Sequence, residues 1–207
     1  MNKGILIALE GPDGSGKSTQ IKLLEEYFVN KGVEVIRTRE PGGTKISEKI
    51  RSVILDNDNK EMDDMCEALL YAASRAQLVR EVIKPAIEAG KVVLCDRFVY
   101  SSIVYQGIAR NLGMDIIKSI NDAALGGLMA DLVFMITIPY EKGIDRKRNQ
   151  KALDRLENGG LEFHKKVFEG YSKISTIYDK IELIDGCNSI EDIHKSIIKR
   201  VESYIGL

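Results

Sequence analysis

Cysteine is scarce in this sequence, and its placement argues against two common kinds of small protein. Cys66, Cys95 and Cys187 are the only three, and no two of them form a C-x-x-C pair. An odd number of widely spaced cysteines argues against a disulfide framework and against a structural zinc site. The same usage is typical of proteins in a reducing compartment, so we expect a cytoplasmic protein.

An excess of charge of one sign is also missing, as is a long apolar run. Lysine and arginine total 30 residues against 31 aspartates and glutamates, which gives a formal net charge of −1. This balance gives no sign of binding to nucleic acid or to an anionic membrane surface. No apolar stretch reaches the roughly 18 residues of a membrane-spanning helix, and the run in "MNKGILIALEG" is too short for a signal peptide.

Short apolar runs alternate with helical patterns along all 207 residues. Runs rich in valine, isoleucine and leucine occur at 4–10, 33–38, 91–96, 131–138 and 180–185. Amphipathic stretches lie between them, including 18–32, 65–90 with an interruption near Pro85, and 189–205. Such alternation is typical of a parallel sheet. We predict an α/β fold in which a five-stranded parallel sheet is wrapped by helices on both faces, as a single domain over 1–207.

The stretch "EGPDGSGKST", residues 10–19, joins the first predicted strand to the first predicted helix and fits the pattern G-x-x-x-x-G-K-[ST]. Its glycines allow backbone N–H groups to converge on phosphate oxygens, and the helix N-terminus adds a positive dipole end. Lys17 is expected to reach the β- and γ-phosphates of a nucleotide and Ser18 to ligate Mg²⁺. The predicted nucleotide-binding residues are Gly11, Asp13, Gly14, Ser15, Gly16, Lys17, Ser18 and Thr19.

Asp96 ends the apolar run "KVVLCD" and is a second candidate for the metal site. Open α/β sheets place ligand groups at the carboxyl ends of their strands, so Asp96 could hold a water of the Mg²⁺ shell. Taken alone, an aspartate there is more often a helix N-cap. Beside the phosphate-binding loop we favour the metal interpretation, with Ser18 and Asp96 as the protein groups.

Three uses of the bound nucleotide can be compared: a switch, a motor and a transferase. A guanine-specific switch needs N-K-x-D after a strand, but "NKEMD" at 59–63 has one residue too many and follows no predicted strand. A motor usually brings further domains, and no segment here suggests them. Arginines, whose planar fork suits phosphate, instead occur in several separate segments. Most surface arginines are simply solvated, but this set favours phosphoryl transfer to a second anionic substrate: Arg39, Arg51, Arg75, Arg97, Arg146, Arg148 and Arg155.

At this point the sequence resembles the bacterial thymidylate kinases over nearly its full length. The resemblance rests on "EGPDGSGKST", "TREPGGT", "IRSVILD", "LLYAASRAQLV", "IKPAI", "DRFVYSSIVYQG" and "DRKRN…LDRLE", in the family's order. Other nucleoside monophosphate kinases share the loop but not the "DRF…SS…YQG" block or "REPGGT". The resemblance implies the nucleoside monophosphate kinase type of P-loop fold, a homodimer, and a transfer of phosphate from ATP·Mg²⁺ to dTMP.

The resemblance also implies a role for individual residues around dTMP. Asp13 would lie near the acceptor sugar and the transferring phosphate, and Arg39 and Arg97 would clamp the phosphate region. Tyr71 would stack on thymine, although it could also be a plain core residue beside Leu69 and Leu70. The full predicted substrate set is Asp13, Arg39, Arg51, Tyr71, Arg75, Arg97, Ser102, Tyr105 and Gln106.

Four further residues receive finer roles from the same resemblance. Arg75 and Ser102 would hydrogen-bond the base edge, and Gln106 would line the same pocket. Tyr105 would crowd the 2′ position of the sugar and so favour deoxyribose. Glu40 would help to order the metal's water.

The segment at about 142–156 resembles the family's mobile lid, although a solvated charged helix would have a similar composition. Arg146 and Arg148 match the lid arginines, but an arginine expected in some relatives falls on Gln150, and others carry arginine where this chain has Gly14. We therefore take Arg148 as the first candidate for the arginine that stabilises the transition state, with Lys151 next. The predicted catalytic residues are Asp13, Lys17, Arg97, Arg146 and Arg148.

Two alternative functions remain open at this stage. The first is another small kinase, acting on dUMP, dCMP or a deoxynucleoside, because the preference for a 5-methyl group is weakly encoded. The second is a non-catalytic nucleotide-binding protein, against which the acceptor motif "DRFVYSSIVYQG" argues. The sequence also leaves open the dimer interface and whether the bond before Pro41 is cis.

Overall fold

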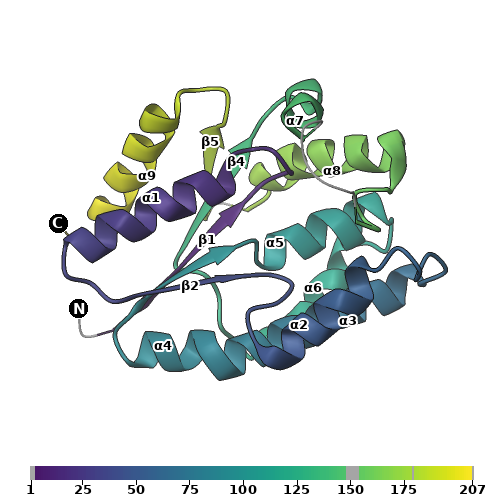
Figure 1. Ribbon diagram of the computed structural model, residues 1–207, viewed down its shortest axis with the longest axis horizontal. Coiled ribbons are helices and arrows are strands. Elements are labelled where there is room, and N and C mark those ends of the chain that lie inside the picture. Colours follow the sequence, from purple (N-terminus) through teal and green to yellow (C-terminus); the bar gives the residue numbers. More distant parts are fainter. Residues whose placement is uncertain (1–2, 148–153, 179, 207) are drawn as a thin grey trace.

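A computed structural model describes residues 3–147, 154–178 and 180–206 of the chain, and its centre is a twisted parallel sheet (Figure 1). Within this part of the chain the sheet has five strands in the order β2-β3-β1-β4-β5, with every neighbouring pair parallel. The predicted five-stranded parallel sheet is therefore confirmed. The strands are β1 (Ile5–Glu10), β2 (Val35–Arg39), β3 (Val92–Asp96), β4 (Leu132–Thr137) and β5 (Ile181–Asp185).

Helices cover both faces of the sheet, as Figure 1 shows. One face carries α1 (Lys17–Asn30) and α9 (Ile190–Ile205), which pack against each other. Two further helices, α2 (Lys45–Leu55) and α7 (Tyr140–Lys147), follow the carboxyl ends of β2 and β4. The other face carries α3 (Asp64–Leu78), η1 (Val79–Ile83), α4 (Lys84–Glu88), α5 (Val99–Ser102), η2 (Ile103–Ala109), α6 (Met114–Leu125) and α8 (Gly160–Ser175).

The central strand β1 shows why its run of sequence is apolar without a break. Leu6 and Ala8 pack into the core formed with α3, η2 and α6, whereas Ile7 and Leu9 pack into the core formed with α1 and α9. Successive residues of a strand point to opposite faces, so a strand covered on both sides needs apolar residues at every position. All six residues of β1 are buried.

The predicted interruption near Pro85 takes the form of a widened helical turn. The chain passes from α3 through the π-helical η1 into α4 without leaving the helix, and Pro85 lies at the start of α4. Proline lacks an N–H and clashes with the preceding turn of an α-helix, and a π-helical turn is one local adjustment to such a break. None of the described helices has both the length and the apolar character needed to span a bilayer.

The carboxyl edge of the sheet collects the loops that the sequence singled out. β1 runs into the loop at 11–16, and β2 runs into the Glu40–Pro41 bond, which is cis. β3 is followed by Arg97, whose φ of 69° is unusual for a residue with a side chain. Because all strands are parallel, these three loops meet at one edge, where open α/β folds bind ligands.

Candidate functional site

The loop after β1 has the backbone of a phosphate cradle. Gly11, Gly14 and Gly16 have φ values of 135°, 76° and 100°, a range that residues with side chains rarely adopt. A Cβ atom on Gly11 would lie 2.1 Å from the carbonyl oxygen of Ile136, so this position also requires glycine for space. Gly16 precedes the first turn of α1, and no side chain caps that helix end. The free N–H groups of such a terminus bind anions.

Lys17 is held close to this loop. Its Nζ donates hydrogen bonds to the carbonyl oxygens of Gly11, at 3.0 Å, and Pro12, at 2.8 Å. Burial lowers the pKa of Lys17 to about 8, and the nearby Arg97 adds to this effect. The ammonium group therefore lies where phosphate oxygens would replace its bonds to loop carbonyls.

Ser18 and Asp96 come together as predicted. The Ser18 hydroxyl donates a hydrogen bond of 2.8 Å to Oδ2 of Asp96, so an alcohol and a carboxylate oxygen lie side by side at the start of α1. Mg²⁺ takes oxygen ligands and keeps much of its water and phosphate coordination, so one or two protein oxygens suffice. The pair fits such an ion. Elsewhere in the described chain, no group of three or more histidine, cysteine, aspartate or glutamate residues could hold a metal.

Asp13 and Arg97 connect the loop to the end of β3. Their side chains form an ion pair, and Arg97 also donates to the carbonyl oxygen of Gly11 at 2.9 Å and to the Tyr171 hydroxyl at 2.8 Å. The guanidinium carbon lies 5.3 Å from the ring centre of Tyr105, in the range of a cation–π contact. Arg97 is thus fixed by charge, hydrogen bonds and an aromatic ring at once.

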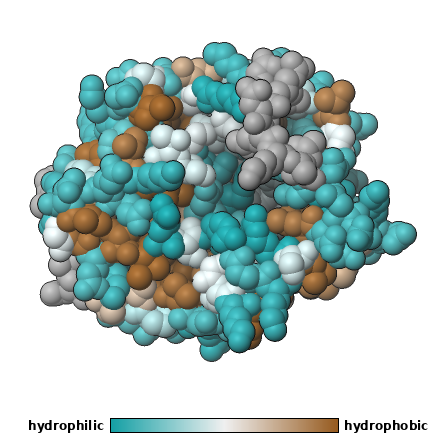
Figure 2. All heavy atoms as spheres, in the orientation of Figure 1, coloured by the Kyte–Doolittle hydropathy of each residue, from teal (hydrophilic) through white to brown (hydrophobic). Residues whose placement is uncertain are grey.

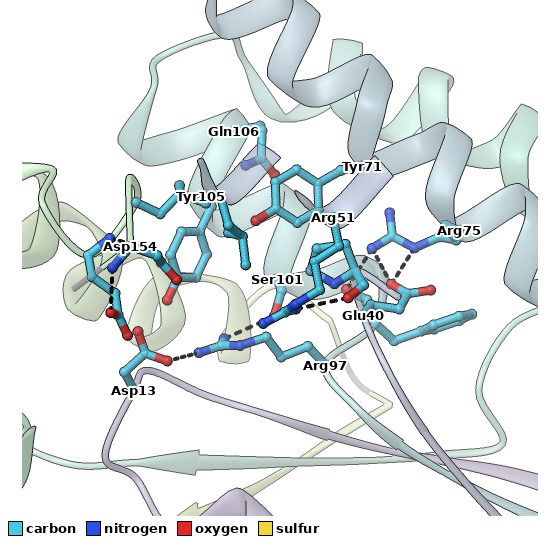
Figure 3. Close-up of a pocket in the computed structure, with 15 residues that line it drawn as sticks. Asp13, Glu40, Arg51, Tyr71, Arg75, Arg97, Ser101, Tyr105, Gln106 and Asp154 are labelled. Carbon is cyan, nitrogen blue, oxygen red and sulfur yellow. Dashed lines mark hydrogen bonds and ion pairs between the residues drawn. The ribbon is translucent and has the colours of Figure 1, made fainter. Parts of the chain in front are cut away.

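Two adjoining openings lie around this ion pair. We call the first the inner cavity (Figure 3); it enters the protein between α2, α3 and η2. It is lined by Asp13, Glu40, Pro41, Arg51, Leu55, Tyr71, Arg75, Arg97, Phe98, Ser101, Tyr105, Gln106, Asp154, Leu156 and Glu157.

The second opening, the outer hollow, lies over the phosphate-binding loop. Figure 2 shows a depression with hydrophilic walls near the middle of this face. The outer hollow shares Asp13, Glu40, Arg51, Arg97 and Glu157 with the inner cavity, so the two adjoin each other at these residues. Its other lining residues are Gly14, Ser15, Gly16, Lys17, Ser18, Thr19, Gln20, Arg39, Asp96, Arg146, Gly186, Asn188, Ile190 and Ile193.

Arg75 is a wall of the inner cavity whose donors are already engaged. It is 1% exposed. Nε and Nη2 both donate to Glu40, Nη1 donates to Ser102 and Asn121, and Nη2 also reaches the carbonyl oxygen of Phe98. A guanidinium has five N–H groups, and these five contacts use all of them. A base at this wall would therefore have to share hydrogens that Arg75 already gives to the protein.

Glu40, the partner of Arg75, is also buried in this wall. Burial raises the pKa of Glu40 to about 7, and Arg75 offsets only part of that effect. One carboxylate oxygen accepts from Arg75, while Oε1 has no hydrogen-bond partner among the described residues. Glu40 borders both the inner cavity and the outer hollow. Its predicted role in ordering the metal's water stays a prediction.

The structure separates two predicted substrate residues from the inner cavity. Arg39 is half exposed and forms a bidentate ion pair with Glu48 at 2.9 and 3.0 Å. Of the two openings it borders the outer hollow and not the inner cavity. Ser102 is buried behind Arg75, and its neighbour Ser101 takes the place on the cavity lining. Arg51 lines both openings and donates to the carbonyl oxygen of Pro41 at 2.9 Å.

The described part of the lid contacts the phosphate-binding loop. Arg146 donates to the carbonyl oxygens of Gly14, at 3.2 Å, and Gly186, at 3.3 Å. Arg148, Gln150 and Lys151 lie outside the described residues, so their predicted roles stay predictions. Arg146 is therefore the one predicted lid arginine that the structure places.

Sequence reasoning missed several residues of the inner cavity. Ser101 donates to the buried Glu10 and contacts the Tyr171 hydroxyl at 2.8 Å. Asp154 and Glu157 line the cavity just after the lid, and both belong to the "LDRLE" string used for the resemblance. Because these two carboxylates belong to that motif, the sequence could have identified them as site residues. Which of Ser101 and Ser102 lines the cavity depends on how the helix is rotated about its axis, and the sequence does not give that rotation.

Comparison with known proteins gives a consistent result. A family model described as thymidylate kinase matches residues 9–197. The chain is 48% identical over 200 residues to the thymidylate kinase of Clostridium novyi (strain NT), covering 95% of this chain and 98% of that protein. It is 48% identical over 204 residues to that of Thermoanaerobacter sp. (strain X514), with 98% and 100% covered. For the thymidylate kinase of Finegoldia magna the identity is 46% over 195 residues, with 94% and 96% covered.

Proposed function

Because the chain belongs to the thymidylate kinase family, we propose that it transfers the γ-phosphoryl group of ATP to dTMP, giving ADP and dTDP. One observation carries this proposal within the structure. The outer hollow adjoins the inner cavity, which is lined by Tyr71 and Gln106, and the Asp13–Arg97 ion pair borders both. A donor and an acceptor can therefore meet with their phosphates beside that pair.

On the donor side, the loop and the first turn of α1 bind the triphosphate. The loop residues 14–16 and the first residues of α1 line the outer hollow, and Lys17, which also lines it, supplies a positive charge. The uncapped N-terminus of α1 has N–H groups that would bind phosphate oxygens. Ser18 and Asp96 would hold Mg²⁺, Asp96 through water. When bound, the ion neutralises charge on the β- and γ-phosphates.

On the acceptor side, the inner cavity supplies one aromatic face and a few polar groups. Tyr71 stacks on the pyrimidine and Gln106 meets its edge, which is sufficient for a flat ring with donors and acceptors on one rim. Arg51 and Arg97 bind the acceptor phosphate, a role supported by their position in the lining of both openings. Tyr105 borders the sugar and restricts the 2′ position.

The chemical step needs positioning and charge more than a base. A phosphate oxygen of dTMP forms a bond to the γ-phosphorus while the bond from that phosphorus to the bridging oxygen breaks, and ADP leaves. The acceptor oxygen is already ionised, so no strong general base is required. Lys17, Arg97 and a basic lid residue stabilise the charge that develops in the water-excluded site. Arg148 is the first candidate for this lid residue and Lys151 the next.

Three further features belong to the same proposal. Residues 142–156 act as a lid, a role supported by the contact of Arg146 with the phosphate-binding loop. The chain forms a homodimer, for which α2, α3 and α6 offer exposed apolar side chains such as Ile46, Leu69 and Ile116. The protein works in the cytoplasm, in keeping with its three free cysteines.

The decisive experiment measures initial rates with ATP·Mg²⁺ against dTMP, dUMP, dCMP, UMP, AMP, GMP and thymidine. We expect kcat/KM for dTMP to exceed that for every other acceptor, and Lys17→Ala to abolish the activity. Preferred turnover of another monophosphate would retain the kinase chemistry and refute dTMP as the substrate. Binding of ATP without turnover of any acceptor would instead support a non-catalytic protein.

A further inference from the structure

Glu67, on α3, is a fully buried carboxylate that does not line the inner cavity but contacts a residue that does. It is 0% exposed. Oε2 accepts from Arg155 at 2.6 Å and from Arg110 at 3.1 Å. Oε1 accepts from the side-chain amide of Gln106 at 2.9 Å. Gln106 itself projects into the inner cavity, where Tyr71 also lies (Figure 3).

The chemistry of Glu67 decides which way the Gln106 amide is turned. A carboxylate that is paired with two guanidinium groups has no hydrogen to donate and only accepts hydrogen bonds. Gln106 must therefore present its NH₂ group to Glu67. Its carbonyl oxygen, Oε1, is buried and has no partner anywhere in the described chain, so it is the group left for a ligand in the cavity.

Glu67 is itself held in place from two sides. Arg155 is 7% exposed on its side chain, and its Nε donates to the carbonyl oxygen of Ile54 at 2.7 Å. Arg110 approaches from the C-terminal end of η2. Removing one partner of a buried ion pair leaves an uncompensated charge, so the carboxylate has no low-energy alternative position.

We propose that Glu67 is a specificity-determining positioning residue, which fixes the Gln106 amide so that its carbonyl oxygen faces the edge of the pyrimidine. This inference rests on the proposed function. Thymine carries a hydrogen on N3 and donates there, whereas cytosine has a bare N3 that accepts. A fixed acceptor at position 106 favours thymine and opposes cytosine, because the wrong base leaves two acceptors facing each other.

The test replaces Glu67 with a residue of the same shape that can also donate. In Glu67→Gln, the new amide can give a hydrogen to Oε1 of Gln106, so the Gln106 amide can turn and present its NH₂ group to the ligand. The readout is the ratio of the dissociation constants of 5-methyl-dCMP and dTMP, measured by calorimetry. We expect this ratio to fall by about tenfold or more in the variant.

A matched control separates orientation from stability. Arg110→Gln removes one ion pair from Glu67 but leaves the carboxylate and its bond to Gln106, so the ratio should stay at the wild-type value. If Glu67→Gln does not fold, the double variant Glu67→Gln/Arg155→Gln removes both buried charges and is read in the same way.

The outcomes distinguish this inference from the proposed function. Equal weakening of both ligands, or an unchanged ratio, in the folded Glu67 variant overturns the role of Glu67 in base selection. A wild-type protein that binds dTMP but does not phosphorylate it overturns the proposed function, while the ratio still decides the role of Glu67. A wild-type protein that binds neither nucleotide overturns both.

Discussion

Oδ1 of Asp13 and Nη2 of Arg97 lie 2.5 Å apart, although the two residues are separated by 84 positions in the chain. The pair joins the phosphate-binding loop to the end of β3, at the junction of the inner cavity and the outer hollow. The Asp13 side chain is 35% exposed and that of Arg97 16%, so the pair is accessible to a ligand from both openings. An incoming phosphate would compete with Asp13 for the guanidinium.

The first prediction concerns Arg97. We expect Arg97→Ala to lower kcat/KM for dTMP by about 10²–10³-fold, because a fixed donor beside the developing charge is lost. Arg97→Lys should recover only part of this, since an ammonium group cannot make the same paired contacts. The measurement is steady-state kinetics with each substrate varied in turn. If kcat/KM of Arg97→Ala fell by less than about threefold, Arg97 would have no role in phosphoryl transfer.

The second prediction concerns the aromatic face of the inner cavity. Tyr71→Ala should raise the dissociation constant for dTMP by about 5–150-fold, the loss expected when a stacking ring is removed. Tyr71→Phe should stay close to wild type because the ring remains. Tyr100→Phe serves as a control, since Tyr100 packs against Tyr178 in the core. Equal affinity in Tyr71→Ala would show that Tyr71 is a packing residue only.

The third prediction uses two glycines with the same backbone strain. Gly14 and Gly32 have φ values of 76° and 74°. A Cβ atom added to Gly14 would lie 2.9 Å from the carbonyl oxygen of Gly143, whereas a Cβ atom added to Gly32 would have no neighbouring atom within 4 Å. Both alanine variants should lose about 1–2 kcal/mol of stability to strain. Only Gly14→Ala should also raise KM for ATP, because α7 must move away from the loop. If KM for ATP were the same in the two variants, the close approach of Gly14 to Gly143 would have no effect on nucleotide binding.

The fourth prediction is a pH dependence of stability. Burial raises the pKa of Glu10, although hydrogen bonds from Ser101 and the charge of Arg97 partly oppose this. The folded protein then holds a proton that the unfolded chain releases near pH 4.5, so the free energy of unfolding falls as pH rises through the higher folded pKa. Glu10→Gln cannot titrate and should show a smaller loss of stability between pH 5 and pH 8 in denaturant unfolding. Parallel losses in both proteins would argue against a raised pKa.

The fifth prediction concerns the lid. Arg148→Ala should lower kcat more than it raises KM for dTMP, because the lid arginine acts mainly in the transition state. Arg146 already donates to the carbonyl oxygen of Gly14 in the phosphate-binding loop, so Arg146→Ala should mainly weaken the association of lid and loop and raise KM for ATP. An unchanged kcat in Arg148→Ala would rule out Arg148 as the residue that stabilises the transition state.

The fold and the phosphate-binding loop could be predicted because local signals decide them. Unbroken apolar runs such as residues 4–10 specify strands buried on both faces, and glycines such as Gly11 mark positions where a side chain cannot fit. The loop motif placed Ser18 near the metal, and the position of Asp96 at the end of a parallel strand placed it at the same edge of the sheet, where the two side chains are in contact.

The substrate side was less predictable because it depends on tertiary contacts and helix phase. Which of Ser101 and Ser102 lines the inner cavity is set by how α5 begins after the left-handed turn at Arg97. Arg39, a predicted phosphate ligand, pairs with Glu48 nine residues away, a contact that the sequence pattern did not indicate. The contacts of Glu67 could not be predicted from the sequence, because its partners lie 39, 43 and 88 positions further along the chain.

The complete engagement of Arg75 has an entropic consequence. A long, flexible side chain normally loses about 0.5–1.5 kcal/mol of conformational freedom when a ligand immobilises it. Arg75 is already held by hydrogen bonds to Glu40, Asn121, Ser102 and Phe98. Its side chain therefore loses conformational entropy when the protein folds and not when a ligand binds. The wall against which a base would lie is therefore rigid before the ligand binds. A base would be recognised by this preorganised surface without rearrangement of Arg75.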